Sequence, residues 1–197
     1  EDLDYQIMIR SIFISFVFST ILFAEFESDL QLKLILAEPG DTIQLESGLF
    51  SILGTLSMEG KENIVIKGSG TNGTILDFST QIEGAQGLSI TNCKNIMLED
   101  FTIQDAKGDA IKCQDTDGII FRHLKTHWTG GPSPTNGAYG LYPVQCKNVL
   151  IENCIAIAAS DAGIYVGQSK NIIVRFSEAY DNVAGIEIEN STNADVY

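Results

Sequence analysis

An internal repeat constrains the fold of this chain more than any other feature. Five segments align, and each begins with a small residue: Gly87, Ala110, Gly140, Gly163 and Gly185. The successive starts are 23, 30, 23 and 22 residues apart, and a turn residue follows eight positions after each start: Asn95, Gly118, Asn148, Asn171 and Asn193. A nearly fixed period of this size indicates a stack of similar coils, each of which contacts only its neighbours.

Apolar residues alternate with polar residues on both sides of each turn residue. In the first copy the alternation runs through Leu88 and Ile90 before the turn, and through Ile96 and Leu98 after it. Alternation over so few residues predicts short strands with one buried face, not helices. A third apolar segment follows six residues after the turn residue, beginning at Phe101 in the first copy. Three short strands in each coil predict an all-β parallel solenoid whose coils are about 4.8 Å apart.

Two other folds share part of this pattern. A leucine-rich repeat has a similar period and an Asn, but the second half of each unit should be helical or dominated by Leu. Here that half is β-branched and interrupted by Gly and Asn. An antiparallel sandwich would show turn signals every 8–12 residues without a fixed longer register. The parallel solenoid therefore fits the sequence best.

The G-I-x-V…N-I-x-V pattern resembles the right-handed parallel β-helix repeats of the pectin-lyase-like superfamily. The stretch LQLKLILAEPGDTIQLESGLF, followed by ENIVIKGSGTNGTILDFS, is similar to the opening of those proteins. The resemblance implies a right-handed, single-stranded parallel β-helix with a short N-terminal capping helix, and it covers about Asp29 to Tyr197. It specifies the fold more than the activity, because the same solenoid carries many chemistries.

One strand of each coil is expected to present a column of candidate functional side chains. If the apolar positions point inward, their neighbours point outward, roughly 5 Å apart, in the order Lys112, Tyr142, Tyr165 and Glu187. In related polysaccharide lyases and hydrolases, the outer face of this sheet and its flanking loops form the substrate groove. The resemblance therefore implies a sugar-binding face here. A Lys or Tyr close to an acidic group can serve as a general base or acid.

The loops that enter this strand supply further candidates. Lys107 and Asp161 precede two of the strands, and the insertion HWTGGPSPTNGAY accounts for the single 30-residue interval. This insertion is expected to place His127, Trp128 and Tyr139 on a loop beside the same sheet. Because binding residues are common on loops of rigid scaffolds, a Trp on such an insertion is the best single functional indication in the sequence.

These residues give a candidate site with two kinds of role. The candidate catalytic residues are Lys112, Tyr142, Tyr165, His127 and Asp161, and the candidate substrate-binding residues are Trp128, Tyr139, Lys107 and Glu187. Structural roles stay open for all of them, because outward tyrosines also stabilise sheets and Asp commonly forms turns. No metal site is expected, since His123 and His127 are predicted on a strand and a loop and not on one helix face.

The charge of the chain limits its partners. Twelve Lys and Arg residues against 26 Asp and Glu residues give a net charge of −14. Nucleic acid is therefore excluded as a partner, because phosphate binding requires a basic surface. The same charge would repel an acidic polysaccharide unless Ca²⁺ or local lysines bridge the two, so Ca²⁺ is the one cofactor left open.

The N-terminal residues are expected to lie outside the mature fold, and the C-terminal end of the fold is expected to be incomplete. Residues 12–23, IFISFVFSTILF, are too few to span a bilayer but suit the apolar region of a signal peptide. A buried core helix or strand is the alternative interpretation. We therefore expect residues 1–24 to be upstream residues and a signal peptide, and 25–197 to be a secreted or periplasmic β-helix domain with no membrane span after cleavage. Because Tyr197 falls inside a repeat, the domain is expected to be truncated at its C-terminus.

The sequence thus predicts an exported β-helix protein that binds or modifies a polysaccharide or oligosaccharide. The expected chemistry is that of a lyase or epimerase acting on a uronate-containing glycan. If two carboxylates such as Asp161 and Glu187 do the work, hydrolysis is favoured instead. The alternative is a non-catalytic binding or scaffold protein in the periplasm or at the cell surface.

Overall fold

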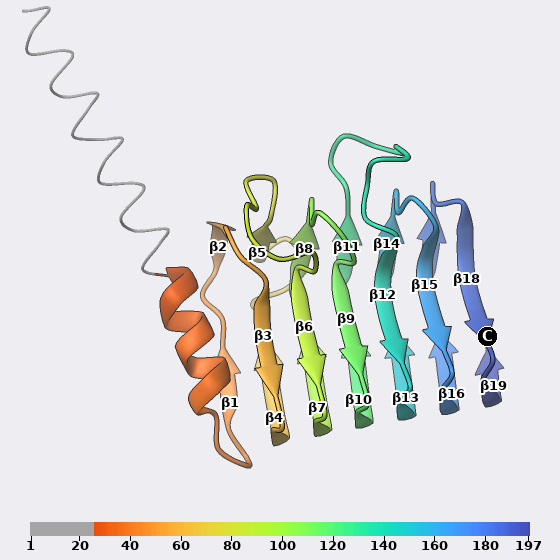
Figure 1. The fold of residues 1–197 in the computed structure, drawn as a ribbon, viewed down its shortest axis with the longest axis horizontal. Helices are drawn as coiled ribbons and strands as arrows, with labels where there is room; N and C mark the ends of the chain where they lie inside the picture. Colours follow the sequence, from red (N-terminus) through yellow and green to blue (C-terminus); the bar gives the residue numbers. More distant parts are fainter. Residues whose placement is uncertain (1–25) are drawn as a thin grey trace, which may run out of the picture.

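The computed structural model describes residues 26–197, which form one solenoid of three parallel sheets (Figure 1). The chain passes through one strand of each sheet in turn, so the strands that pair come from successive coils. This arrangement confirms the predicted all-β parallel β-helix.

We name the sheets A, B and C. Sheet A contains β1 (Thr42–Gln44), β4 (Glu62–Lys67), β7 (Lys94–Glu99), β10 (Asp117–Arg122), β13 (Lys147–Glu152), β16 (Lys170–Arg175) and β19 (Thr192–Val196). Sheet B contains β2 (Gly48–Ser51), β5 (Thr74–Asp77), β8 (Thr102–Gln104), β11 (Lys125–His127), β14 (Ile155–Ile157) and β17 (Glu178–Tyr180). Sheet C contains β3 (Leu56–Glu59), β6 (Leu88–Thr91), β9 (Ile111–Gln114), β12 (Tyr139–Val144), β15 (Ala162–Gly167) and β18 (Ala184–Glu189).

The register of sheet C confirms the predicted stacking of apolar residues. The parallel pairs join the inward position of each coil to that of the next coil, through Leu88, Ile111, Leu141, Ile164 and Ile186. The first four side chains are at most 2% exposed, and Ile186 packs against the core from the last coil. The side chains that follow them therefore face outward, as the sequence predicts.

Asparagines stabilise the turns at which successive strands of sheet A begin. Asn148 and Asn171 both have a positive φ, of 55° and 58°, a conformation that Asn tolerates better than most residues. The Asn171 side-chain amide donates to Asn148 Oδ1 at 2.9 Å, and Asn193 donates to Asn171 in the same way. The predicted turn residues thus form a ladder of hydrogen bonds between coils.

The helix at residues 26–36 covers the N-terminal end of the solenoid, beside β1 and β3 (Figure 1). Leu30 and Leu34 of this helix are buried in the core, and the Phe26 ring stacks on Phe50 with 3.7 Å between ring centroids. The Glu27 carboxylate accepts hydrogen bonds from the backbone N–H groups of Leu53 and Gly54. These contacts confirm the predicted capping helix.

The predicted signal peptide at residues 1–24 lies outside the described part of the chain. Within residues 26–197, no helix has both the length and the apolar character needed to cross a membrane.

Candidate functional site

Three tyrosines meet on the outer face of sheet C. Tyr139 and Tyr142 come from β12, and Tyr165 comes from the neighbouring β15. The centroid of the Tyr139 ring lies 4.7 Å from that of Tyr142 and 4.6 Å from that of Tyr165. The ring centroids of Tyr142 and Tyr165 are 5.3 Å apart. All three rings remain partly exposed. We call Tyr139, Tyr142 and Tyr165 the tyrosine cluster.

A local break in the strand alternation brings Tyr139 into this cluster. Leu141 points into the core, and a Cβ at Gly140 would also point inward, since it would lie 2.5 Å from Thr126 Oγ1 and 3.2 Å from Ala156 Cβ. Two consecutive inward positions shift the alternation by one residue. Tyr139 therefore faces outward on the same side as Tyr142.

Gly167 makes room for the ring of Tyr165. A Cβ on Gly167 would lie 2.7 Å from the Tyr165 ring, so a larger residue at this position would displace the ring. The ring lies beside Gly167 toward the next coil, where the Tyr165 hydroxyl donates a hydrogen bond to Glu189. That hydrogen bond, followed by burial, raises the pKa of Tyr165 well above its usual value. The hydroxyl is therefore a proton donor at neutral pH.

Two aspartates flank the tyrosine cluster. Burial, followed by the charge of Asp161, raises the pKa of Tyr139 to about 12. Burial also raises the pKa of Asp109, although the nearby Lys112 ammonium opposes the shift. Burial and then the charge of Asp109 raise the pKa of Tyr142. The hydroxyls of all three tyrosines thus stay protonated near carboxylates.

The remaining predicted residues of the outward column lie beside the tyrosine cluster. Lys112 pairs with Tyr142 in the register, and its Nζ lies 5.4 Å from the centroid of the Tyr142 ring. Glu187 pairs with Tyr165 on the other side. Lys107 lies exposed on the loop that leads into β9, with its backbone N–H bound to the Gln81 side chain. The structure therefore brings together Tyr139, Tyr142, Tyr165, Lys112, Asp161 and Glu187.

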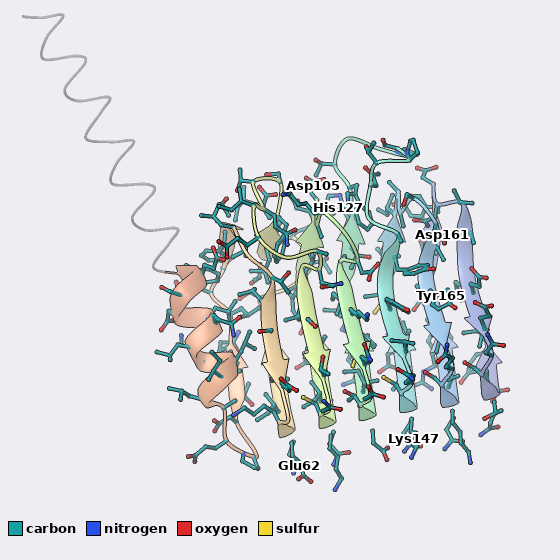
Figure 2. All side chains as sticks on the ribbon, viewed as in Figure 1. Glu62, Asp105, His127, Lys147, Asp161 and Tyr165 are labelled. Atoms are coloured by element: carbon teal, nitrogen blue, oxygen red, sulfur yellow. The ribbon has the colours of Figure 1, made fainter. Side chains whose placement is uncertain are left out.

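His127 does not join this group, and its predicted placement on a loop beside sheet C is wrong. It ends β11 of sheet B, close to Asp105, whereas Asp161 directly precedes β15 and Tyr165 lies within that strand (Figure 2). Burial, followed by the positive charge of Lys125, lowers the pKa of His127, so the imidazole is neutral at pH 7. The Asp105 carboxylate is occupied by hydrogen bonds from the backbone N–H and the hydroxyl of Thr129.

Trp128 is also not an exposed loop residue. Its side chain is 6% exposed within the core, and its indole N–H donates to the Ala106 carbonyl at 2.8 Å. The inserted loop returns over it, because a Cβ at Gly137 would lie 2.8 Å from the indole and 1.7 Å from the Gly108 carbonyl oxygen. Trp128 therefore anchors the insertion and has no free ring face for a sugar. Tyr139 likewise belongs to β12 and not to the loop.

Glu189 is the site residue that the sequence reasoning missed. It ends β18, two positions after Glu187, so the same alternation that places Glu187 outward places Glu189 outward as well. The register pairs Glu189 with Gly167, which has no side chain to separate it from Tyr165. The sequence signal for this contact was Gly167, which occupies the position opposite Glu189 in the preceding coil.

The described residues hold no cluster of three or more His, Cys, Asp and Glu side chains arranged for a metal ion. The face of sheet C is thus built from aromatic rings, hydroxyls and carboxylates. Such a surface can stack a ring-shaped ligand and exchange hydrogen bonds with its polar groups.

Residues 54–197 match the family described as the right handed beta helix region, so this chain belongs to that family. Its fold is a right-handed parallel β-helix. A comparison with curated proteins found no significant match in sequence.

Solved structures with a similar fold include three at low sequence identity. A protein proposed to be a glycosyl hydrolase from Parabacteroides merdae ATCC 43184 is 16% identical, with a TM-score of 0.49 over 81% of this chain and 73% of its own. Pectin methylesterase PemA from Erwinia chrysanthemi is 14% identical, with a TM-score of 0.49 over 75% of this chain and 49% of its own. A pectin methylesterase mutant in complex with hexasaccharide IV is 12% identical, with a TM-score of 0.46 over 82% of this chain and 60% of its own. These likenesses concern the fold alone.

Proposed function

We propose that the outer face of sheet C binds a polysaccharide or oligosaccharide chain across the tyrosine cluster. One observation carries the proposal: three aromatic rings from two adjacent strands meet on an outer sheet face and remain partly exposed. Sugar rings present C–H surfaces that pack against aromatic rings, and their hydroxyls can donate to carboxylates. Asp109, Asp161 and Glu187 lie where they can accept such hydrogen bonds.

The lyase or epimerase reaction that the sequence predicts is less well supported by this geometry. It needs a base for the proton next to a uronate carboxylate, and a cation to neutralise that carboxylate. Lys112 is the cation on this face, and Tyr142 or Tyr165 would be the base. Because the pKa of each tyrosine is raised, loss of the phenolic proton is unfavourable. We therefore favour glycan binding over lyase or epimerase chemistry as the function of this site.

Glycoside hydrolysis is a second candidate, because carboxylates lie on both sides of Tyr139. Asp109 and Asp161 are two strands apart, so their Cα atoms are separated by roughly 10 Å. Inverting hydrolases hold their two carboxyl groups about 6.5–9.5 Å apart. The raised pKa of Asp109 suits a general acid, and Asp161 would then activate the water. If the site hydrolyses glycans, Asp109→Asn should abolish the release of reducing ends, while the protein still binds the glycan.

Isothermal titration calorimetry of the protein with a panel of hexasaccharides tests the binding proposal. We expect Tyr165→Ala to weaken binding at least tenfold, because it removes one ring of the contact surface. The matched control is Tyr180→Ala, which removes an exposed tyrosine from sheet B and should leave binding unchanged. Loss of binding in both variants, or in neither, would contradict the proposed site.

Export remains a prediction, and we include it in the proposal. The apolar segment at residues 12–23 supports it through its length and composition. Fractionation of a bacterial host that expresses the whole chain should recover the protein outside the cytoplasm, with a new N-terminus near residue 25. Recovery of the uncleaved chain in the cytoplasm would reject this part.

A further inference from the structure

The charges around the tyrosine cluster are strongly unbalanced. Four carboxylates lie on this face or at its edge: Asp109, Asp161, Glu187 and Glu189. The cations there are Lys112 and, on the adjoining loop, Lys107. None of the four carboxylates forms an ion pair with a Lys, Arg or His side chain in the described part of the chain. The site therefore carries uncompensated negative charge.

The aromatic rings add to this preference for positive charge. A cation over the face of a tyrosine is attracted by the negative face of the ring. The protein itself shows the interaction, because Lys112 Nζ lies 5.4 Å from the centroid of Tyr142. Tyr165 lies on the opposite side of the cluster, next to Glu187 and Glu189, and its ring meets no Lys or Arg among the residues described. An ammonium group of a ligand could take that place.

We propose that the glycan bound on sheet C carries free amino groups, as a polymer of 2-amino-2-deoxyhexose does. This inference rests on the proposed function, since it assigns a ligand class to the same site. The ligand amine would lie over the face of the Tyr165 ring, next to the carboxylates of Glu187 and Glu189. The sugar rings would pack along the tyrosine cluster.

The same charges disfavour a uronate polymer. Each uronate carboxylate would approach carboxylates of the same charge, and this repulsion disfavours binding. Lys112 and Lys107 could offset part of this cost on one side of the cluster only. The tyrosine hydroxyls respond to the same negative charge, because Asp161, Asp109 and Glu189 contribute to their raised pKa values.

Three β-1,4-linked hexasaccharides that differ only at carbon 2 provide a matched test: the amine, the N-acetylated amine and the plain hydroxyl. Hexagalacturonate serves as the acidic ligand. Calorimetry at mildly acidic pH keeps the sugar amines protonated and most carboxylates ionised. We expect the amine form to bind at least tenfold more tightly than the other three. This advantage should shrink as salt is added, because exposed charges are screened.

A pair of variants connects the preference to the site. Glu187→Gln should reduce the preference for the amine form over the hydroxyl form several-fold, because it removes the negative charge and keeps an oxygen that accepts hydrogen bonds. Glu178→Gln, an exposed glutamate on β17 of sheet B, is the matched control and should change neither. Equal binding of the amine and hydroxyl forms, or tighter binding of hexagalacturonate, would overturn this inference but not the proposed function. Failure of every hexasaccharide to bind would overturn both.

Discussion

The outer faces of sheets A and C differ in whether their charged side chains form ion pairs. On sheet A, charged side chains at the strand ends alternate in sign and pair across coils. Lys67 binds Glu99 at 2.8 Å, and Glu152 lies between Arg122 and Arg175 at 2.6 and 2.7 Å. On sheet C, the carboxylates around the tyrosine cluster have no such partners within residues 26–197.

This contrast separates the charges that stabilise the fold from those that are available to a ligand. Pairing across coils offsets the charges at the C-terminal ends of the sheet A strands and holds successive coils in register. Burial of the Asp109 carboxylate without an ion-pair partner costs free energy, and such costs are typical of functional sites. We therefore assign structural roles to the charges of sheet A and a binding role to those of sheet C.

The largest expected effect on stability comes from Glu152. Because Glu152 is 7% exposed and bound by two arginines, Glu152→Ala removes the carboxylate that both guanidinium groups bind at 2.6 and 2.7 Å. We expect a loss of about 3 kcal/mol in the free energy of unfolding, measured by denaturant titration. Glu187→Ala on sheet C is the control and should change stability by less than about 0.5 kcal/mol. Similar losses in both variants would remove the contrast between the faces.

The asparagine ladder of sheet A should give the next effect. Asn148→Ala removes a hydrogen bond to Asp117 and one from Asn171, and it places Ala at a φ of 55°. We expect a loss of about 2 kcal/mol in denaturant titration. Asn148→Gly removes the same hydrogen bonds without the backbone penalty, so it should lose less. If the Gly variant is as unstable as the Ala variant, the backbone conformation contributes nothing.

Acid should narrow the gap between wild type and Glu152→Ala. Hydrogen bonds from Arg175 and then Arg122 lower the pKa of Glu152 below its value in the unfolded chain. The stability that Glu152 contributes is therefore complete above the unfolded pKa and is lost as the pH falls through the folded pKa. Thermal unfolding of both proteins between pH 7 and pH 3 measures this gap. A gap that stays constant would show that the ionised carboxylate is not the source of the stability.

The smallest effect on stability is expected for a substitution of Asp109, beside sheet C, and this substitution should stabilise the fold. Burial raises the pKa of Asp109, so its ionised form destabilises the fold at neutral pH. We expect Asp109→Asn to raise the free energy of unfolding by up to about 1 kcal/mol at pH 7, and by less at pH 4, where the wild-type carboxyl is partly protonated. A loss of stability at pH 7 would mean that Asp109 serves the fold.

The sequence predicted the solenoid well, because its signals are local. The alternation around Leu141 and Ile164 and the spacing of the Asn turns depend only on neighbouring residues and on the coil period. The outward positions of Lys112, Tyr142, Tyr165 and Glu187 follow from the same alternation.

The parts of the site that the sequence did not predict depend on packing between coils. Trp128 is buried because the insertion returns over it at Gly137, a contact that no periodicity encodes. Tyr139 joins the cluster because Gly140 interrupts the alternation. The hydrogen bond between Tyr165 and Glu189 requires the gap left by Gly167, which lies on the same strand as Tyr165 and opposite Glu189.

Nuclear magnetic resonance mapping of a bound hexasaccharide of 2-amino-2-deoxyglucose shows directly whether the tyrosine cluster binds a glycan. We expect titration to shift the signals of Tyr139, Tyr142 and Tyr165 and of the backbone amides of β12, β15 and β18. The ladder residues of sheet A should stay unchanged. Shifts confined to sheet A or sheet B, with the tyrosine signals unmoved, would contradict binding at the tyrosine cluster.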